Sequence, residues 1–395
     1  MPNVVVRQIH TDEEILDDFL IIGNYAFGAT PPMDSEEKRR EFLPYAKERH
    51  IVVTYEDNQP RAAAAAINMI QNIRGKIFPM GGISPVAAHP LGRRKGYARQ
   101  ALIKVFGLLR EEGHAFTGLY PFRESFYQRL GYVTYPRIMK IDVDAANLSS
   151  LSKHNIEGIV EMMPVSEGQE IMQSFLTRLQ QKTHGMSLFT GKNAERIADR
   201  NEQWLAVARF NGNVEGIMLY KITGFGKALD ANWFLTLTSR ARYALLAYIA
   251  RHVDQVKTVT ISLRHDESPQ TWLTDMLPRS NPDIWLTAMG RVLDVARIGG
   301  MNVGPGAVVL TINDEQCEWN NSTWAFKSVD GKLVVESSEA SADGSLSIQG
   351  LTALVNGTHD PHDFDFRGWG DISSEVADKL EIMFPQLSPT MFSAY

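Results

Sequence analysis

The stretch that decides the fold is Ser84-Pro85-Val86-Ala87-Ala88-His89-Pro90-Leu91-Gly92, which runs directly into Arg93-Arg94-Lys95-Gly96-Tyr97-Ala98. The small residues at 81–88 predict a strand, and apolar residues at helical spacing from Ala98 to Leu109 predict a helix. A basic turn that contains a glycine therefore lies between a strand and a helix. Backbone N–H groups at a helix N-terminus, a glycine that permits close approach and neighbouring cations suit a pyrophosphate group. A solvated basic turn is the alternative, and the strand–turn–helix context favours the phosphate-binding loop.

The rest of the first 145 residues predicts a mixed α/β unit. Thr11-Asp12-Glu13-Glu14 is a capping-box pattern that opens an apolar helix. Antiparallel strands are predicted before the basic turn, at 51–55, 62–70 and 77–80. Another strand at 115–120 and a short helix at 123–130 follow the helix after the turn.

Two further units follow. The polar segment 142–154 predicts a boundary, and the pattern beyond it repeats the coarse layout of the first unit without a repeat of individual residues. Short strands near 308–311, 323–328 and 333–336, with closing helices near 351–356 and 373–383, give the last part a different pattern. We therefore predict an α+β (mixed α/β) protein with three domains at 1–145, 146–285 and 286–395.

The composition excludes several classes of protein. Of the 395 residues, 44% are hydrophobic and 22% are charged, which is typical of a globular protein with real cores. Lys+Arg number 40 against 46 Asp+Glu, so the net charge of −6 gives no basic footprint for nucleic acid. The single cysteine, Cys317, allows no intramolecular disulfide and suits a reducing compartment. No secretory signal or apolar run of about 18 residues is visible, so we expect a cytoplasmic protein without a membrane partner.

Two motifs together resemble a known family. Arg93-x-x-Gly96-x-Ala98 resembles the acetyl-CoA motif R/Q-x-x-G-x-G/A of the GNAT acetyltransferases. The stretch from Phe126-Tyr127 to Gly131-Tyr132 is similar to the F-Y-x-x-x-G-Y signature of the Eis-like group within that family. Met289–Val295 resembles the opening of that group's third domain. The resemblance covers essentially the whole chain, and it implies tandem GNAT-type domains followed by a sterol-carrier-protein-like domain.

The resemblance implies one site for acetyl-CoA as a cosubstrate. Pantetheine would pair with the backbone of one strand end, pyrophosphate would lie in the basic turn, and the end of the next strand would lie beside the same molecule. The implied cofactor-binding residues are Val86, Ala87, Ala88, Arg93, Arg94, Lys95, Gly96, Tyr97, Ala98, Arg99, Phe122 and Arg123. The second unit has Ser239-Arg240-Ala241-Arg242-Tyr243 at the corresponding turn, without a glycine, so side chains would block the approach of a phosphate. We therefore expect a single cofactor site per chain.

Tyr127 is the predicted general acid. Acetyl transfer expels a thiolate whose conjugate acid titrates near ~8.5, and a phenol with a pKa near ~10 can protonate it. Ordinary packing is the alternative for a tyrosine in this position. The family's general acid falls on Tyr127, with Tyr132 and Tyr120 as reserve candidates. Tyr120-Pro121-Phe122 is bulkier than the residues some members have there, which bears on the choice of acceptor.

Tyr395 is the predicted proton acceptor. The last twelve residues, 384–395, are largely apolar and carry no charged side chain, which favours docking over a frayed tail. The resemblance implies that the terminal carboxylate of Tyr395 takes a proton from the incoming amine. Sealing of the third domain against the first is the alternative.

Two other features carry less chemistry. The segment His359–Asp365 is rich in histidine and aspartate, but Pro361 in an apparent loop favours a solvated acidic loop, and no metal is expected. Cys317 has no cationic neighbour in sequence that would lower its thiol pKa.

The sequence thus favours an acetyl-CoA-dependent N-acetyltransferase that acts on a primary amine. The family suggests an aminoglycoside, polyamine-like or lysine-type acceptor, and a negative protein is compatible with a cation. The alternative is a non-catalytic acyl-CoA- or lipid-binding carrier or sensor. The family also implies a homo-oligomer, with a hexamer preferred.

Overall fold

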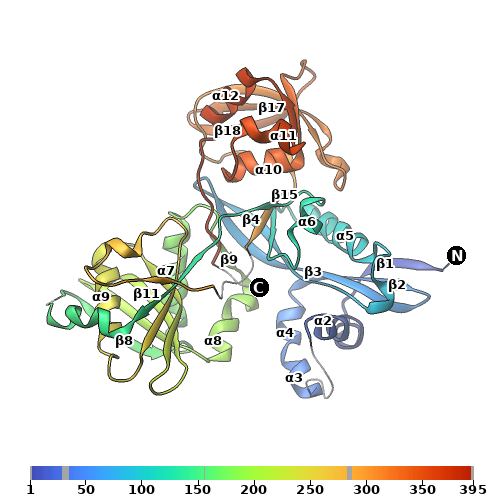
Figure 1. Ribbon diagram of the computed structural model, residues 1–395. Helices are drawn as coiled ribbons and strands as arrows, with labels where there is room; N and C mark the ends of the chain where they lie inside the picture. The colour runs from blue at the N-terminus through green and yellow to red at the C-terminus, as the bar shows by residue number, and fades with distance from the viewer. Residues whose placement is uncertain (1, 29–34, 155, 283–286, 393–395) are drawn as a thin grey trace.

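The computed structural model describes residues 2–28, 35–154, 156–282 and 287–392, which form three sheets. In Figure 1 the red and orange C-terminal part lies above the two other parts, and the end of the chain descends from it to the junction between them. The mixed α/β class predicted from the sequence is confirmed.

The first sheet contains the predicted phosphate-binding turn. Its path is β1 (Val4–Gln8), β2 (Arg49–Glu56), β3 (Gln59–Ile73), β4 (Lys76–Ala88), β5 (Phe116–Leu119), β15 (Met289–Val292) and β6 (Val133–Thr134), and β9 (Ser187–Phe189) also pairs with β3. Its helices are α1 (Asp12–Glu14), the π-helical turn η1 (Ile15–Leu20), α2 (Ile21–Ala26), α3 (Glu36–Glu41), α4 (Leu43–Ala46), α5 (Tyr97–Glu111) and α6 (Glu124–Gln128). The predicted capping box is present, because the Thr11 hydroxyl and the Glu14 side chain each bond the other residue's backbone.

The second sheet repeats this order. Its path is β8 (Ile159–Pro164), β10 (Trp204–Phe210), β11 (Asn213–Ile222), β12 (Ala228–Thr236), β13 (Thr258–Leu263), β7 (Met139–Asp144) and β14 (Arg279–Ser280). The helices of this unit are α7 (Gln169–Gln180), α8 (Arg196–Arg200) and α9 (Ser239–Ala250). In both units one parallel pair, β4 with β5 or β12 with β13, stands among antiparallel neighbours.

Each of these sheets takes strands from beyond its own unit, and the first sheet takes two, β9 and β15. β7 follows β6 in the chain but lies in the second sheet, beside β13. β15 follows β14 in the chain but lies in the first sheet, between β5 and β6. Met289–Val292, which resembles the opening of the third domain, therefore forms a strand of the first sheet. The domain limits at 145 and 285 remain a prediction, and the hydrogen-bonded sheets do not follow them strictly.

The third sheet has the order β18 (Lys332–Ser337), β17 (Ser322–Val329), β16 (Ala307–Asn313), β19 (Gly344–Ser347) and β20 (Gly370–Ile372). It is accompanied by α10 (Ile348–Asn356), α11 (Phe364–Arg367) and α12 (Ser374–Met383). One buried core joins this domain to the first unit, since Phe78 and Phe116 belong to the same cluster as Leu310 and Phe326. The third domain is thus packed tightly on the first unit, which contains the candidate active site.

Candidate active site

The two parallel strands of the first unit separate where the cosubstrate is expected. β4 pairs with β5 only from Met80 to Gly82, while the rest of β4 stays paired with β3, where Val86, Ala87 and Ala88 lie opposite Ala64, Ala63 and Ala62. In an antiparallel pair alternate backbone groups point away from the partner strand. The end of β4 therefore offers unpaired amide groups toward the opening, and these suit an amide-containing chain such as pantetheine.

The basic turn leads into α5 in a conformation that requires glycine. Gly96 is the N-cap residue of α5 and has a φ of +81°, and no side chain caps the helix. The first N–H groups of a helix have no partner within the helix, so those of α5 are available to a ligand. A Cβ on Gly96 would meet no protein atom within 4 Å, whereas a Cβ on Gly92 would lie 2.6 Å from the Arg61 carbonyl oxygen. Space for a ligand thus lies in front of Gly96, and Gly92 packs the turn against β3.

The predicted cations of this turn have different surroundings. Arg93 and Arg94 are exposed, and within the described residues neither forms an ion pair with a carboxylate. Lys95 Nζ instead lies 2.8 Å from Glu56 Oε1, which also accepts a hydrogen bond from the Tyr97 hydroxyl at 2.7 Å. These hydrogen bonds, from Lys95 first and then from Tyr97, lower the pKa of Glu56. Arg93 and Arg94 are the free cations of the turn, while Lys95 and Tyr97 attach it to β2.

The side of α5 that faces the third domain borders a cavity. Arg99 Nε donates to the Gln316 side-chain oxygen at 2.9 Å, and this pair belongs to a cavity of about 540 Å³ between the first unit and the third domain. The same cavity is lined by Arg129 beside α6 and by Gln349 of α10. The third domain therefore contributes polar side chains close to the predicted cofactor loop, a contribution that no sequence motif indicates.

Tyr127 lies in α6, within an aromatic cluster. Its side chain is 3% exposed and makes edge contacts with Phe122, Phe126 and Tyr132 at centroid distances of 5.6, 5.0 and 5.9 Å. Burial raises the pKa of the Tyr127 phenol. Within the described residues its hydroxyl has no hydrogen-bond partner. Tyr127 shares one core with Ile83 of β4 and with α5, so strand end, helix and phenol are brought together.

The two reserve tyrosines are engaged elsewhere. The Tyr132 hydroxyl accepts a hydrogen bond from Thr117 at 2.9 Å in the core, and the Tyr120 hydroxyl donates to the Met391 carbonyl oxygen at 3.3 Å. Phe122 is 63% exposed and Arg123 is the exposed N-cap residue of α6, so both lie at the surface beside the cluster. Tyr395 lies outside the described residues.

The other sequence features belong to the third domain. His359 is partly covered by Trp369, and burial lowers its pKa to about 4. Pro361 begins a short 3-10 turn that continues into α11, so this stretch is less of an open loop than expected. Among the described residues, no group of three or more His, Cys, Asp or Glu side chains is arranged to hold a metal ion. Cys317 is buried with its Sγ 3.2 Å from Arg291 Nη2, and burial raises the pKa of the thiol to about 12.

Family models match three consecutive parts of the sequence. A GNAT acetyltransferase domain matches residues 6–134, a second GNAT acetyltransferase domain matches residues 188–298, and a sterol carrier protein domain matches residues 295–392. The chain thus combines two GNAT acetyltransferase domains with a sterol carrier protein domain. The predicted order of tandem GNAT domains and a sterol carrier domain is confirmed, and GNAT domains use acetyl-CoA as cosubstrate.

Several solved structures share this fold over the full length of the chain. A GCN5-related N-acetyltransferase from Kribbella flavida has 20% identity and a TM-score of 0.83, with 100% of this chain and 99% of that chain covered. A probable N-acyltransferase from Enterococcus faecalis V583 has 18% identity and a TM-score of 0.87, and Eis1 from Mycobacterium abscessus has 14% and 0.77, each with both chains fully covered. A search of curated protein sequences found no significant match.

No described helix is both long and apolar enough to cross a membrane.

Proposed function

We propose that this GNAT protein transfers the acetyl group of acetyl-CoA to a primary amine. The observation that supports this most is the convergence, in one core, of the open β4 edge, the uncapped start of α5 and the Tyr127 hydroxyl. That hydroxyl has no hydrogen-bond partner in the part of the chain that the structure describes. The edge at 86–88 would pair with pantetheine, and the turn at 93–99 would hold pyrophosphate, with Arg93 and Arg94 as its cations. The adjoining cavity beside Arg99 and Arg129 would take the nucleotide end.

Tyr127 would act as the general acid. The amine nitrogen forms a bond to the thioester carbonyl carbon, the carbon–sulfur bond breaks, and Tyr127 gives its proton to the departing thiolate. A phenol with a raised pKa is fully protonated at neutral pH, so the proton is present when it is needed. The Tyr120 hydroxyl already donates its proton to the Met391 carbonyl oxygen, and Tyr132 is fully buried beside Thr117. Both observations favour Tyr127 over them.

The carboxylate of Tyr395 would accept the proton that the amine must lose. The support comes from the described end of the tail, since Met391 bonds Tyr120 directly after β5. An unperturbed terminal carboxyl has a pKa near ~3.5, so it would work through burial or through a relaying water. The negative net charge of −6 favours a cationic acceptor such as an aminoglycoside, a polyamine-like amine or a lysine side chain.

The decisive experiment measures thiol release from acetyl-CoA with a panel of primary amines. Tyr127→Phe should lower kcat by about 10²–10⁴ with little change in the KM for acetyl-CoA, the usual range for loss of a general acid. Tyr132→Phe is the matched control and should keep most of the activity. Equal losses in the two variants would remove Tyr127 from this role.

A carrier or sensor is the second candidate function. The sterol carrier protein domain is the observation that favours it. Turnover with no amine in the panel, together with tight lipid binding by the full chain, would support this candidate over the enzyme. We also propose that the protein assembles as a homo-oligomer, with a hexamer preferred.

A further inference from the structure

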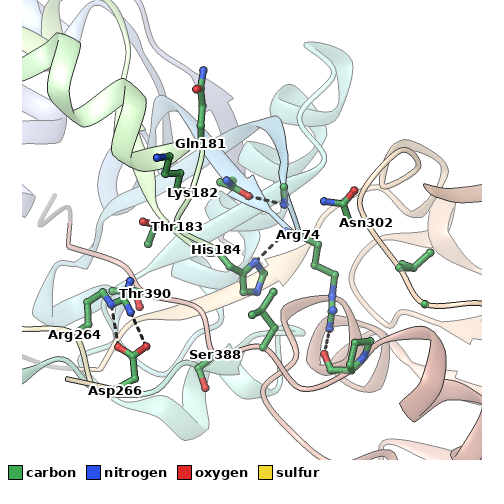
Figure 2. Close-up of a pocket in the computed structure, with 16 residues that line it drawn as sticks. Arg74, Gln181, Lys182, Thr183, His184, Arg264, Asp266, Asn302, Ser388 and Thr390 are labelled. Atoms are coloured by element: carbon green, nitrogen blue, oxygen red, sulfur yellow. Dashed lines mark hydrogen bonds and ion pairs between the residues drawn. The ribbon is translucent and has the colours of Figure 1, made fainter. Parts of the chain in front are cut away.

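The chain after α12 runs through a channel built from all three domains. Its backbone is held in turn by Arg74, which donates from Nη2 to the Pro385 carbonyl oxygen at 2.9 Å, and by Gly357, whose carbonyl accepts from Leu387 N–H at 3.2 Å. Thr390 N–H then donates to the His184 carbonyl oxygen at 2.9 Å. Figure 2 shows Arg74, His184, Ser388 and Thr390 around the resulting cavity of about 580 Å³, of which the tail forms one wall.

Two glycines make room for this backbone. A Cβ on Gly185, whose φ is +80°, would lie 2.4 Å from Pro389 Cβ and 2.7 Å from the Thr390 nitrogen. A Cβ on Gly357, whose φ is +65°, would lie 2.5 Å from the Leu387 nitrogen. Contacts this short exclude any larger residue unless the tail moves. The channel is therefore shaped to the tail at two separate points.

The channel ends at the opening of the second GNAT unit. β12 and β13 pair in parallel only from Ala228 to Ala231, and beyond that point they separate as β4 and β5 do in the first unit. Phe392 lies in this opening, 9% exposed, in one core with Leu235 of β12, and it lines the same cavity as Leu263 at the end of β13. This cavity has a volume of only about 30 Å³. The same place in the repeated fold thus receives a cosubstrate in one unit, by our proposal, and a side chain of the protein itself in the other.

We infer that the opening between β12 and β13 is an internal docking site for Phe392, and that this anchor fixes the end of the tail beside β5 for catalysis. Met391, one residue before the anchor, carries the carbonyl oxygen that accepts from Tyr120 at the end of β5. With Phe392 docked on one side and Tyr120 bonded on the other, the backbone enters the catalytic unit at a defined point. Phe392 is a positioning residue, and the inference rests on the proposed role of Tyr395.

The test compares Phe392→Ala with Phe210→Ala in the full chain. Phe210 is a buried phenylalanine of the second unit's other core, so it controls for the loss of a core side chain. Phe392→Ala should lower kcat for amine acetylation at least tenfold at unchanged KM for acetyl-CoA, and hydrogen exchange should speed up over 385–392. Phe392→Leu should restore most of the rate, and Phe210→Ala should leave both readouts unchanged.

A second variant covers the case in which Phe392→Ala does not fold. Gly185→Ala displaces the tail without removing a core side chain, and Gly212→Ala controls for strain, because Gly212 has a φ of +80° with no protein atom near its Cβ position. Gly185→Ala should reproduce the kcat loss and Gly212→Ala should not. Full kcat with a deprotected tail, or a tail that stays protected in Phe392→Ala, would overturn the inference. Lack of activity in the unmodified protein with every amine would instead count against the proposed function.

Discussion

The guanidinium of Arg291 lies 2.7 Å from the carboxylate of Asp314, and both side chains are fully buried. Arg291 belongs to β15, and it also donates from Nε to the Leu130 carbonyl oxygen at the end of the Tyr127 segment. Asp314 follows β16 of the third domain and also accepts from Asn320. This ion pair therefore connects β15 and the Tyr127 segment of the first unit to the sterol carrier domain.

Removal of one member of this pair should be costly. Asp314→Ala leaves a buried guanidinium without its counter-charge, and such changes destabilise proteins by about 3–5 kcal/mol. The measurement is the denaturant midpoint of the transition that reports on the first unit. Asp266→Ala is the control, because the Arg264–Asp266 pair is solvent-exposed and such pairs contribute about 1 kcal/mol or less. Similar losses in the two variants would contradict this account.

Stability should fall below neutral pH because of His184. Its Nδ1 accepts from the Arg74 backbone N–H at 3.0 Å, so the ring must be neutral, with Nε2 donating to the Asn356 carbonyl oxygen at 3.0 Å. Burial lowers the pKa of His184 to about 4 from a usual value of 6.5. The folded state binds its proton less readily than the unfolded state, so this contribution is complete above pH 6.5. It is lost as the pH falls toward 4, by roughly 3 kcal/mol.

Unfolding midpoints between pH 8 and 4 check this expectation. His184→Asn should lower stability at pH 7.5 and flatten the pH dependence. His359, whose pKa is also lowered to about 4, contributes in the same window, so His359→Asn is the companion variant. An unchanged slope in His184→Asn would show that its protonation is not coupled to folding.

Gly96→Ala should separate strain from cosubstrate binding. A non-glycine residue in the left-handed region costs about 1–2 kcal/mol, so both Gly96→Ala and Gly212→Ala should lose stability to a similar degree. Only Gly96→Ala should also raise the KM for acetyl-CoA, because only Gly96 begins the helix that would face the pyrophosphate. Unchanged acetyl-CoA affinity in a folded Gly96→Ala protein would remove this turn from the site.

The two kinds of cation in the turn should behave differently. Arg94→Ala should weaken acetyl-CoA binding by up to about 1.5–3 kcal/mol, or about 10- to 100-fold in Kd, because a charge-assisted contact is lost. Lys95→Ala should have a smaller effect on Kd, since Lys95 is already paired with Glu56. Calorimetric titration with acetyl-CoA distinguishes them, and the reverse order of effects would contradict the assignment of the free cations.

The assembly is open to a direct measurement. The proposed homo-oligomer predicts a mass of several chains at micromolar concentration, with six preferred. Light scattering gives this mass without a label. The mass of a single chain under these conditions would contradict the proposed homo-oligomer.

Local patterns predicted much of the fold because they depend on neighbours in sequence. The capping box at Thr11–Glu14 and the helix after the basic turn both follow from residues within a few positions of one another. Strands β7 and β15 were not predicted as members of their sheets. Their partners lie more than a hundred residues away in the chain, and short strand segments carry no mark of the sheet that they join.

The candidate site shows the same division. Gly96 and Tyr127 could be predicted from the sequence, because each belongs to a short motif. A glycine permits close approach of a ligand, and a phenol can donate a proton. The pairing of Lys95 with Glu56, the approach of Gln316 to Arg99 and the channel around Thr390 could not be predicted, since each depends on tertiary contacts. The glycines at 185 and 357 were the local signals for the channel, and single glycines are too common to reveal it.

The exchange of β7 and β15 also orders events during synthesis. All strands of the second sheet lie between residues 139 and 280, whereas the first sheet needs β15 at residues 289–292. Domains usually form from the N-terminus as the chain leaves the ribosome. In this protein the second sheet has its full set of strands before β15 of the first sheet has been synthesised. Of the two GNAT units, the one that is translated first is therefore completed second.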